Sequence, residues 1–243
     1  MERTILLLVL STAVEGDTGK HIFVPEKMIW SDAQIYCRNQ YTDLSYVRSQ
    51  SGVDRLRKAA GESNPQGWIG LHRDLNNLTG WKWSGGGHMT YQNWCQGQPD
   101  NCHNIETSVN VINENGEWND DAETKQKDFY CINITVVEVK KTWEKALEHC
   151  RENQSDLTSL LDETEHLLAW KEALKVQSER VWIGLRYLGD RWLWVNGDPL
   201  QYEAWPQGDQ DHQCPIYKRC GALTKEGLWE NWDCKEKLNF ICI

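Results

Sequence analysis

The sequence lacks any cluster of positive charge. Its 26 Lys and Arg residues are scattered singly among 36 Asp and Glu residues, and the formal net charge is −10. Proteins that bind nucleic acids through the phosphate backbone usually present a basic patch or stripe. We therefore expect no nucleic-acid partner for this chain.

Long apolar segments are also scarce. Beyond residue 16, no stretch reaches the roughly 20 apolar residues that are needed to cross a bilayer, so we expect no membrane span. Residues 1–16 contain Arg3, the apolar run Ile5–Leu10 and then small residues, which is the layout of a secretory signal peptide. The alternative, a buried first strand, agrees less well with the nine Cys residues in the chain. We interpret residues 1–16 as a signal peptide and the protein as secreted and extracellular.

Three Asn-x-Ser/Thr sequons agree with an extracellular compartment, because this tripeptide is the acceptor for N-linked glycosylation. The predicted glycosylation sites are Asn77, Asn133 and Asn153.

Patterns typical of a catalytic centre are missing. The seven His residues show no zinc-ligand spacing such as His-Glu-x-x-His. His212 and Cys214 lie close together, but no third orienting residue or nucleophile motif accompanies them. A Cys in a secreted chain is usually disulfide-bonded. We expect a binding protein and not an enzyme.

Phenylalanine is rare, with three residues against 14 Trp, and the Trp residues belong to an internal repeat. Trp-Ile-Gly-Leu occurs at 68–71 and 182–185, and Trp-x-Trp occurs at 81–83 and 192–194. The segment from Cys37 to Cys131 returns as the segment from Cys150 to Cys242. A repeat of this length is a domain with its own core and not a solenoid unit. We name residues 21–131 copy one and residues 136–243 copy two.

Each copy follows one plan of helices and strands. In copy one, a strand is expected at 21–24, a helix from Ser31 and a second helix from Ser51 to Gly61. In copy two, Thr142 and Asp162 are the expected caps of the two helices. The segments after each Trp-Ile-Gly-Leu are short and rich in turns, as in a small antiparallel sheet with long loops. The predicted fold class is α+β.

The boundary between the copies is short. About ten residues, Ile132 to Lys141, separate the last Cys of copy one from the first helix cap of copy two. They include Val136, Val137 and Val139, so we predict the next first strand here and not a flexible linker.

These motifs resemble the C-type lectin-like domain, as found in macrophage mannose receptor-like proteins. The resemblance is carried by the Trp-Ile-Gly-Leu strand, the Trp-x-Trp pair, and Trp118-Asn-Asp120 thirteen residues before a closing Cys. It covers both copies over essentially their whole length. It implies a double-looped α+β domain that binds its ligand mostly in the long loop after Trp-x-Trp.

The resemblance also implies a set of disulfides, which sequence alone leaves open. Cys37–Cys131 and Cys150–Cys242 would join the ends of each copy, and Cys220–Cys234 would be an inner bridge of copy two. Copy one lacks that inner bridge, and we pair its remaining Cys95 with Cys102. Cys214 then has no partner, and it is either the site of a disulfide-linked dimer or a buried free thiol.

The resemblance places a Ca²⁺ and carbohydrate site in copy one. The residues are hard oxygen ligands of the kind that Ca²⁺ takes, and Pro99 would direct its neighbours toward one point if its peptide bond is cis. The predicted ligands of both metal and sugar are Gln98, Asp100, Glu106, Asn119 and Asp120. The alternative is a set of polar loop residues that binds no metal.

The order Gln98-Pro99-Asp100 resembles the galactose-preferring version of the family motif rather than the mannose-preferring Glu-Pro-Asn. Exchange of amide and carboxylate changes which pair of hydroxyls finds a matching donor and acceptor. We therefore favour galactose-type over mannose-type glycans. Galactose binders of the family usually stack the sugar on a loop Trp, whereas this loop offers only His103.

Copy two departs from the metal motif. It has Asp209-Gln210-Asp211 without proline, Lys218 near the expected Glu position, and Glu230-Asn231 after Trp229. A cation at a ligand position repels Ca²⁺. We expect copy two to bind no calcium, and it is a candidate for binding a protein ligand. The competing hypothesis for the whole chain is a calcium-independent protein-binding module of the same fold.

Overall fold

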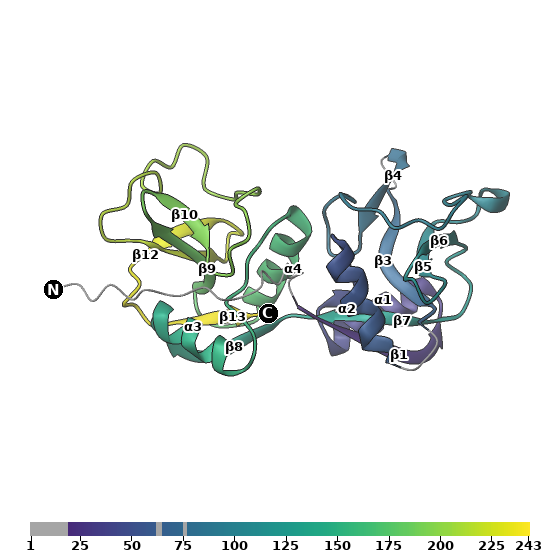
Figure 1. Ribbon diagram of the computed structural model, residues 1–243, viewed down its shortest axis with the longest axis horizontal. Coiled ribbons are helices and arrows are strands. Elements are labelled where there is room, and N and C mark those ends of the chain that lie inside the picture. The colour runs from purple at the N-terminus through teal and green to yellow at the C-terminus, as the bar shows by residue number, and fades with distance from the viewer. Residues whose placement is uncertain (1–18, 62–64, 75–76) are drawn as a thin grey trace.

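The computed structural model describes residues 19–61, 65–74 and 77–243, so the predicted signal peptide lies outside the described residues. Figure 1 shows two halves side by side, each with two helices and a β-sheet. None of the helices among the described residues is long and apolar enough to cross a membrane.

The described residues of copy one form two α-helices, one 3-10 turn and seven strands. In chain order they are β1 (Lys20–Met28), α1 (Trp30–Gln40), β2 (Asp43–Leu44), α2 (Gln50–Ala60), β3 (Gly67–Asp74), β4 (Asn77–Trp83), η1 (Cys102–Asn104), β5 (Ser108–Val111), β6 (Trp118–Asp121) and β7 (Lys127–Asn133).

Copy two repeats the plan with six strands. The elements are β8 (Thr135–Lys141), α3 (Trp143–Glu152), α4 (Glu163–Ala173), β9 (Arg180–Leu188), β10 (Arg191–Trp194), β11 (Cys220–Thr224), β12 (Trp229–Trp232) and β13 (Leu238–Cys242). The predicted strand at the boundary between the copies is therefore confirmed as β8.

The two sheets have matching topologies. The order is β1-β7-β3-β5-β6 in copy one, with β2 on β7 and β4 on β3. In copy two it is β12-β11-β9-β13-β8, with β10 on β9. The pairs β3–β7 and β9–β13 are parallel, and every other described pair is antiparallel. Mixed polarity, with helices beside the sheets, confirms the α+β class.

Two of the helix starts follow the predicted capping residues. Thr142 accepts a hydrogen bond from the Lys145 amide and Asp162 accepts one from the Glu165 amide. The cap of α2 is Ser49, two residues before the predicted start. The helix predicted from Ser31 begins instead at Trp30, whose buried indole donates to the Ile69 carbonyl at 2.9 Å. Burial of Trp30 thus sets this helix start, and no side chain caps it.

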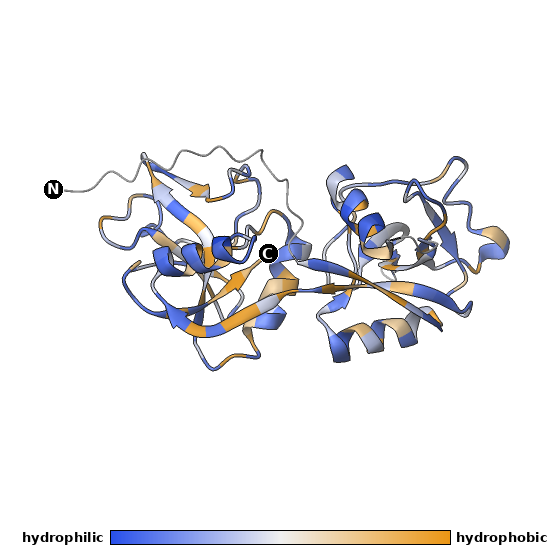
Figure 2. Ribbon diagram, turned by 60° about the horizontal axis from the view of Figure 1, so that its bottom comes forward, coloured by the Kyte–Doolittle hydropathy of each residue, from blue (hydrophilic) through white to orange (hydrophobic). Residues whose placement is uncertain are grey.

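The repeated Trp residues form the cores. Trp68, Trp118, Trp182 and Trp229 are among the largest fully buried side chains. Trp68 donates its indole N–H to the Met28 carbonyl and Trp182 donates to Lys141, so each first strand is tied to its Trp-Ile-Gly-Leu strand in the same way. The indole thus supplies apolar area and satisfies its one polar group. Figure 2 shows hydrophilic and hydrophobic residues side by side in both halves of the molecule.

Three of the four predicted disulfides are present: Cys37–Cys131, Cys150–Cys242 and Cys220–Cys234. The predicted Cys95–Cys102 bridge is wrong, because both thiols are free. The Cys95 amide donates to the Trp118 carbonyl at 2.9 Å, whereas the Cys102 amide donates to the Glu106 carboxylate at 2.7 Å. Each backbone segment is thus held by its own partner. Cys214 is also free, and it is exposed, not buried.

The two copies are joined tightly. Ile134 is the single residue between β7 and β8, it is 3% exposed, and its amide donates to the Thr42 hydroxyl at 3.0 Å. Helix α4 of copy two lies between the two halves in Figure 1. Its Thr164 hydroxyl donates to the Gly86 carbonyl at 3.0 Å, and its Lys171 ammonium lies 3.1 Å from the buried Asp43 carboxylate. Apolar side chains of both copies belong to one buried cluster.

Candidate metal centre

Three acidic side chains of copy one converge where its long loop meets the sheet. Asp100 follows the Gln98–Pro99 peptide bond, which is cis, Glu106 follows the 3-10 turn η1, and Asp120 lies on β6. One carboxylate oxygen from each of the three lies within 4.8 Å of the others. Asp120 is fully buried and Glu106 nearly so, whereas Asp100 is exposed. This is the only such group of three or more His, Cys, Asp or Glu side chains in the described part of the chain.

Asp120 is the centre of the hydrogen bonds that shape the loop. Its carboxylate accepts from the Asp100 amide at 3.0 Å and from the Asn101 amide at 3.0 Å. It also accepts from Nη2 of Arg73 on β3, at 3.1 Å. The backbone of the loop is therefore folded around a carboxylate on a rigid strand. A buried charge needs such partners to offset its lost hydration.

Glu106 is held against the same loop. Its carboxylate accepts from the Cys102 amide at 2.7 Å, and its own amide donates to the Asn101 side chain at 3.2 Å. Burial, a side-chain hydrogen bond with Asp100 and the nearby charges of Asp120 and Asp100 together raise the pKa of Glu106, against the lowering effect of the Cys102 amide. The three acids therefore repel one another, and a bound cation would relieve that repulsion.

The two predicted amide ligands are placed differently. The Gln98 side-chain oxygen accepts from the Asp100 amide at 3.2 Å, which sets it beside the acids. The Asn119 side chain donates to the backbone carbonyl of Asp120. Successive residues of a strand point to opposite faces, so Asn119 and Asp120 diverge on β6. The structure thus brings Asp100, Glu106 and Asp120 together with Gln98 next to them, while Asn119 is turned toward its own backbone.

The three carboxylates fit a calcium ion. Ca²⁺ takes oxygen ligands at about 2.3–2.6 Å, so two of its ligands can lie up to roughly 5 Å apart on opposite sides. The 4.8 Å limit within this group falls inside that span. Three carboxylates and the Arg73 guanidinium give a formal charge of −2, which a divalent cation balances. The donor set is of hard oxygens alone, which favours Ca²⁺ over softer metals.

Arg73 is the site residue that sequence reasoning missed. It lies two residues after the Trp-Ile-Gly-Leu motif, where copy two has Tyr187. Its guanidinium also donates to the Glu106 carbonyl at 3.3 Å and lies 4.4 Å from the ring centre of Trp81. The difference between Arg73 and Tyr187 in otherwise matching copies is the signal that could have found it.

Side chains around the site offer few flat apolar surfaces. His103 is exposed on the loop, and Ile105, beside Glu106, is 56% exposed. Neither side chain is a large aromatic ring of the kind expected to stack on galactose.

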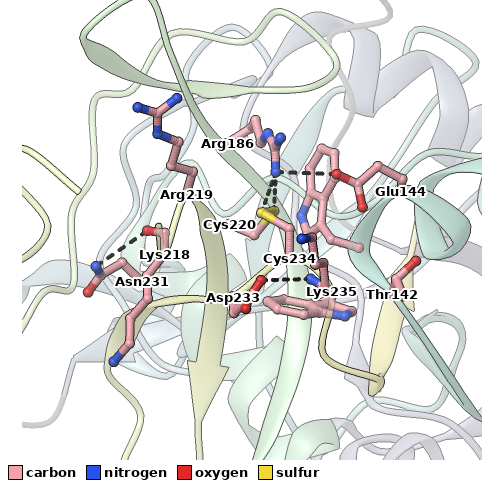
Figure 3. The surroundings of a disulfide bond; sticks show 12 residues. Thr142, Glu144, Arg186, Lys218, Arg219, Cys220, Asn231, Asp233, Cys234 and Lys235 are labelled. Atoms are coloured by element: carbon pink, nitrogen blue, oxygen red, sulfur yellow. Dashed lines mark hydrogen bonds and ion pairs between the residues drawn. A yellow bond between two sulfur atoms is a disulfide. The ribbon is translucent and has the colours of Figure 1, made fainter. Parts of the chain in front are cut away.

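In copy two the corresponding loop contains Asp209 and Asp211, but an amide replaces the buried strand acid. Asn231 lies at the position of Asp120, and its side-chain amide donates to the carbonyls of Asp211 and Lys218, both at 3.4 Å. The hydrogen bonds are therefore reversed in sense: a carboxylate accepts in copy one, whereas an amide donates in copy two. Figure 3 shows Asn231 beside Lys218. The Lys218 ammonium lies 4.7 Å from the ring centre of Trp232.

The neighbouring disulfide of copy two is covered by a cation. The Arg186 guanidinium lies against both sulfurs of Cys220–Cys234 and 3.5 Å from the Glu144 carboxylate (Figure 3). Burial, opposed by the charge of Glu144 and aided by that of Arg219, lowers the pKa of Arg186. Lys218 and Arg219 point away from each other in Figure 3, so these cations do not converge on one point.

Known proteins resemble this chain over most of its length. The profile of the Lectin C-type domain matches residues 26–133 and 139–243. Human lymphocyte antigen 75 is 24% identical over 259 residues, which cover 88% of this chain and 14% of that protein. Mouse C-type mannose receptor 2 is 21% identical over 280 residues, which cover 94% of this chain and 19% of that protein. The chain thus spans less than a fifth of the length of these two relatives.

Solved structures match single copies. The carbohydrate-recognition domain of the mouse scavenger receptor C-type lectin is 30% identical, with a TM-score of 0.43, over 48% of this chain and 92% of that chain.

Proposed function

The chain belongs to the C-type lectin family, and we propose that copy one is a calcium-dependent carbohydrate-binding domain. The observation that carries the proposal is the convergence of Asp100, Glu106 and Asp120 within 4.8 Å around a loop that begins at the cis Gln98–Pro99 bond. When bound, Ca²⁺ would supply a Lewis-acidic centre to which neutral oxygens such as sugar hydroxyls can add.

In this proposal different residues of copy one bind the ion and the sugar. Asp100, Glu106 and Asp120 would hold the ion, with Gln98 and Asn119 supplying amide groups for the ion and for two vicinal hydroxyls. Asn119 would have to rotate away from the Asp120 carbonyl to take part. The order Gln98 then Asp100 supports a preference for galactose-type glycans. The affinity for one exposed sugar should be near millimolar, about −4 kcal/mol, because few contacts form.

We further propose that the protein acts outside the cell. Signal-peptide features at 1–16 and three sequons support secretion. Asn77 and Asn153 are exposed, and Asn133 is half-buried next to the copy boundary. Exposed Cys214 is available for a disulfide-linked dimer, and a dimer would raise the avidity for clustered glycans. The assigned domains are residues 21–131 and 136–243.

The test of the lectin function is a glycan array probed with the purified chain in calcium and in EDTA. We expect binding to galactose or N-acetylgalactosamine arrays in calcium and loss of that binding in EDTA. Exchanging Gln98→Glu together with Asp100→Asn should move the preference toward mannose while calcium binding persists. Binding that survives EDTA, or no glycan binding at saturating calcium, would overturn the assignment.

A second function is favoured for copy two by the replacement of Asp120 with Asn231 and by the uncharged hydrogen bonds that Asn231 makes. These contacts occupy the place of the calcium ligands with neutral groups, so a protein ligand of copy two would be bound without calcium. The matching test is capture of a partner in EDTA by the whole chain carrying Asp120→Asn, in which the proposed calcium site is disabled.

A further inference from the structure

We propose that Arg73 is the resident counter-ion of the candidate calcium site. It holds Asp120 and the loop in place when no cation is bound, and it makes calcium binding weaker than the three carboxylates alone would give. This inference rests on the proposed calcium site and adds to it the residue that sets the calcium concentration at which the site fills.

The position of Arg73 supports the first part of this role. Its Nη2 lies 3.1 Å from Oδ2 of Asp120, and its Nε donates to the Glu106 backbone carbonyl at 3.3 Å. One guanidinium therefore links the strand that carries Asp120 to the segment that carries Glu106. The Arg73 side chain is 18% exposed, and its guanidinium packs on the Trp81 ring, which restricts the side-chain conformation. A guanidinium held in this way is pre-organised for a carboxylate.

The comparison between the copies supports a link to metal binding. Arg73 lies on β3 and Tyr187 lies on β9, each two residues after Trp-Ile-Gly-Leu on the same strand. Arg73 pairs with Trp81, and Tyr187 pairs with Trp192. In copy two, the Tyr187 hydroxyl donates to the Gln213 carbonyl at 3.3 Å, so a neutral group contacts the loop there. The cation occurs in the copy that has the three carboxylates and is replaced in the copy that lacks them.

The electrostatic sign follows from the charges. Without Arg73, three carboxylates repel one another with no internal compensation, which raises the free energy of the ion-free state. With Arg73, an incoming Ca²⁺ meets a positive charge on the same carboxylate that is to bind it. Both effects weaken calcium binding in the wild type. The Asp100 and Asn101 amides still bond Asp120 when Arg73 is removed, so the loop retains two of its three anchors there.

The test is calorimetric titration of the whole chain with CaCl₂, for the wild type and for Arg73→Met. Met keeps the apolar stem on Trp81 and removes the charge. We expect calcium to bind roughly tenfold more tightly to Arg73→Met, by the size of Coulomb interactions at a partly buried site. In EDTA, the same variant should melt at a lower temperature than the wild type, because Asp120 has lost a partner. A variant that was merely damaged would not gain calcium affinity.

Three further variants keep the test decisive. Arg73→Lys retains the charge and should keep the wild-type calcium affinity within about threefold, the context-dependence expected of one charge. Arg73→Gln retains a donor without charge and replaces Arg73→Met should that variant fail to fold. Lys82→Met removes one cation from the neighbouring strand β4 and should leave calcium affinity unchanged. Calcium affinity that is equal or weaker in both uncharged Arg73 variants overturns the role of Arg73. A wild type that binds no calcium contradicts the calcium site itself, and this inference with it.

Discussion

The phenol of Tyr46 in copy one donates a hydrogen bond of 3.0 Å to the carboxylate of Glu165 in copy two, 119 residues later in the chain. The Glu165 side chain is fully buried, and it also accepts from the Leu161 amide at 2.7 Å. Arg48 of copy one lies 3.8 Å from the same carboxylate. A buried acid shared in this way couples the stability of copy two to that of copy one.

The first prediction concerns the contact between the two copies. Gly87 has φ +76°, and a Cβ there would overlap the Thr164 hydroxyl and lie 2.9 Å from the Thr164 amide nitrogen of α4. We expect the wild type to unfold in one calorimetric transition and Gly87→Ala to unfold in two, because added volume separates the copies. Gly189→Ala is the control, since Gly189 also has positive φ but has nothing within 4 Å of its added Cβ. Two transitions already present in the wild type would contradict the prediction.

The second prediction separates two neighbouring acids. Asp120→Asn removes one of the three clustered carboxylates and should weaken calcium binding by at least about a hundredfold, roughly 3 kcal/mol, for the loss of a charged ligand. Asp121→Asn is its matched control, because Asp121 pairs with Lys125 and Lys127 and not with the cluster. Calorimetry with CaCl₂ distinguishes them. An equal loss of calcium affinity in the two variants would show that these acids act only through the net negative charge of the chain and not as ligands.

The third prediction is a pH dependence that arises from His21. This side chain is 5% exposed, its Nδ1 lies 3.0 Å from the Ser45 hydroxyl, and its Nε2 has no hydrogen-bond partner among the described residues. Burial, with a contribution from the charge of Arg55, lowers the pKa of His21 from 6.5 to about 3. The unfolded state therefore binds a proton below pH 6.5 that the folded state refuses.

The resulting loss of stability begins as the pH falls through 6.5 and grows by about 1.4 kcal/mol per unit until pH is near 3. His21→Gln should flatten the dependence of the free energy of unfolding on pH between 6.5 and 4.5, measured by urea denaturation in EDTA. The exposed His88, changed to Gln, should leave the slope as it is. An unchanged slope in His21→Gln would mean that His21 is protonated in the folded protein.

The fourth prediction concerns the thiols. Cys95, Cys102 and Cys214 are free, so the monomeric chain unfolded without reductant should react with three equivalents of Ellman's reagent. One equivalent would instead mean that Cys95 and Cys102 are bonded after all. If Cys214 joins two chains, a reducible dimer should appear on a gel and disappear in Cys214→Ser.

The sequence predicted the features that depend on local pattern. The repeat of Trp residues predicted two like domains, and the capping residues Thr142 and Asp162 are the observed helix caps. The outer disulfides followed from matching the copies to a known family. Asp100, Glu106 and Asp120 were expected to meet, and their carboxylates do so.

The remaining features depend on pairings that no local pattern encodes. Arg73 on β3 reaches Asp120 on β6 across the intervening strand β5, which requires the order of the sheet. The contact between Thr164 and Gly86 requires the placement of one copy against the other. The Cys95–Cys102 prediction relied on nearness in sequence, but the Cys95 backbone bonds to β6 while the Cys102 backbone bonds to Glu106.

The junction at Ile134 has a geometric consequence for recognition. One buried residue separates β7 from β8, and α4 contacts copy one, so in the described part of the chain the copies are joined without a flexible linker between those strands. The direction in which the copy-one loop faces is then set by the orientation of copy two. If two chains are joined through Cys214, the range of distances between their proposed sugar sites is restricted. Such an assembly would bind most tightly to glycan arrays whose terminal sugars match the spacing of its two sites, even when each sugar is held weakly.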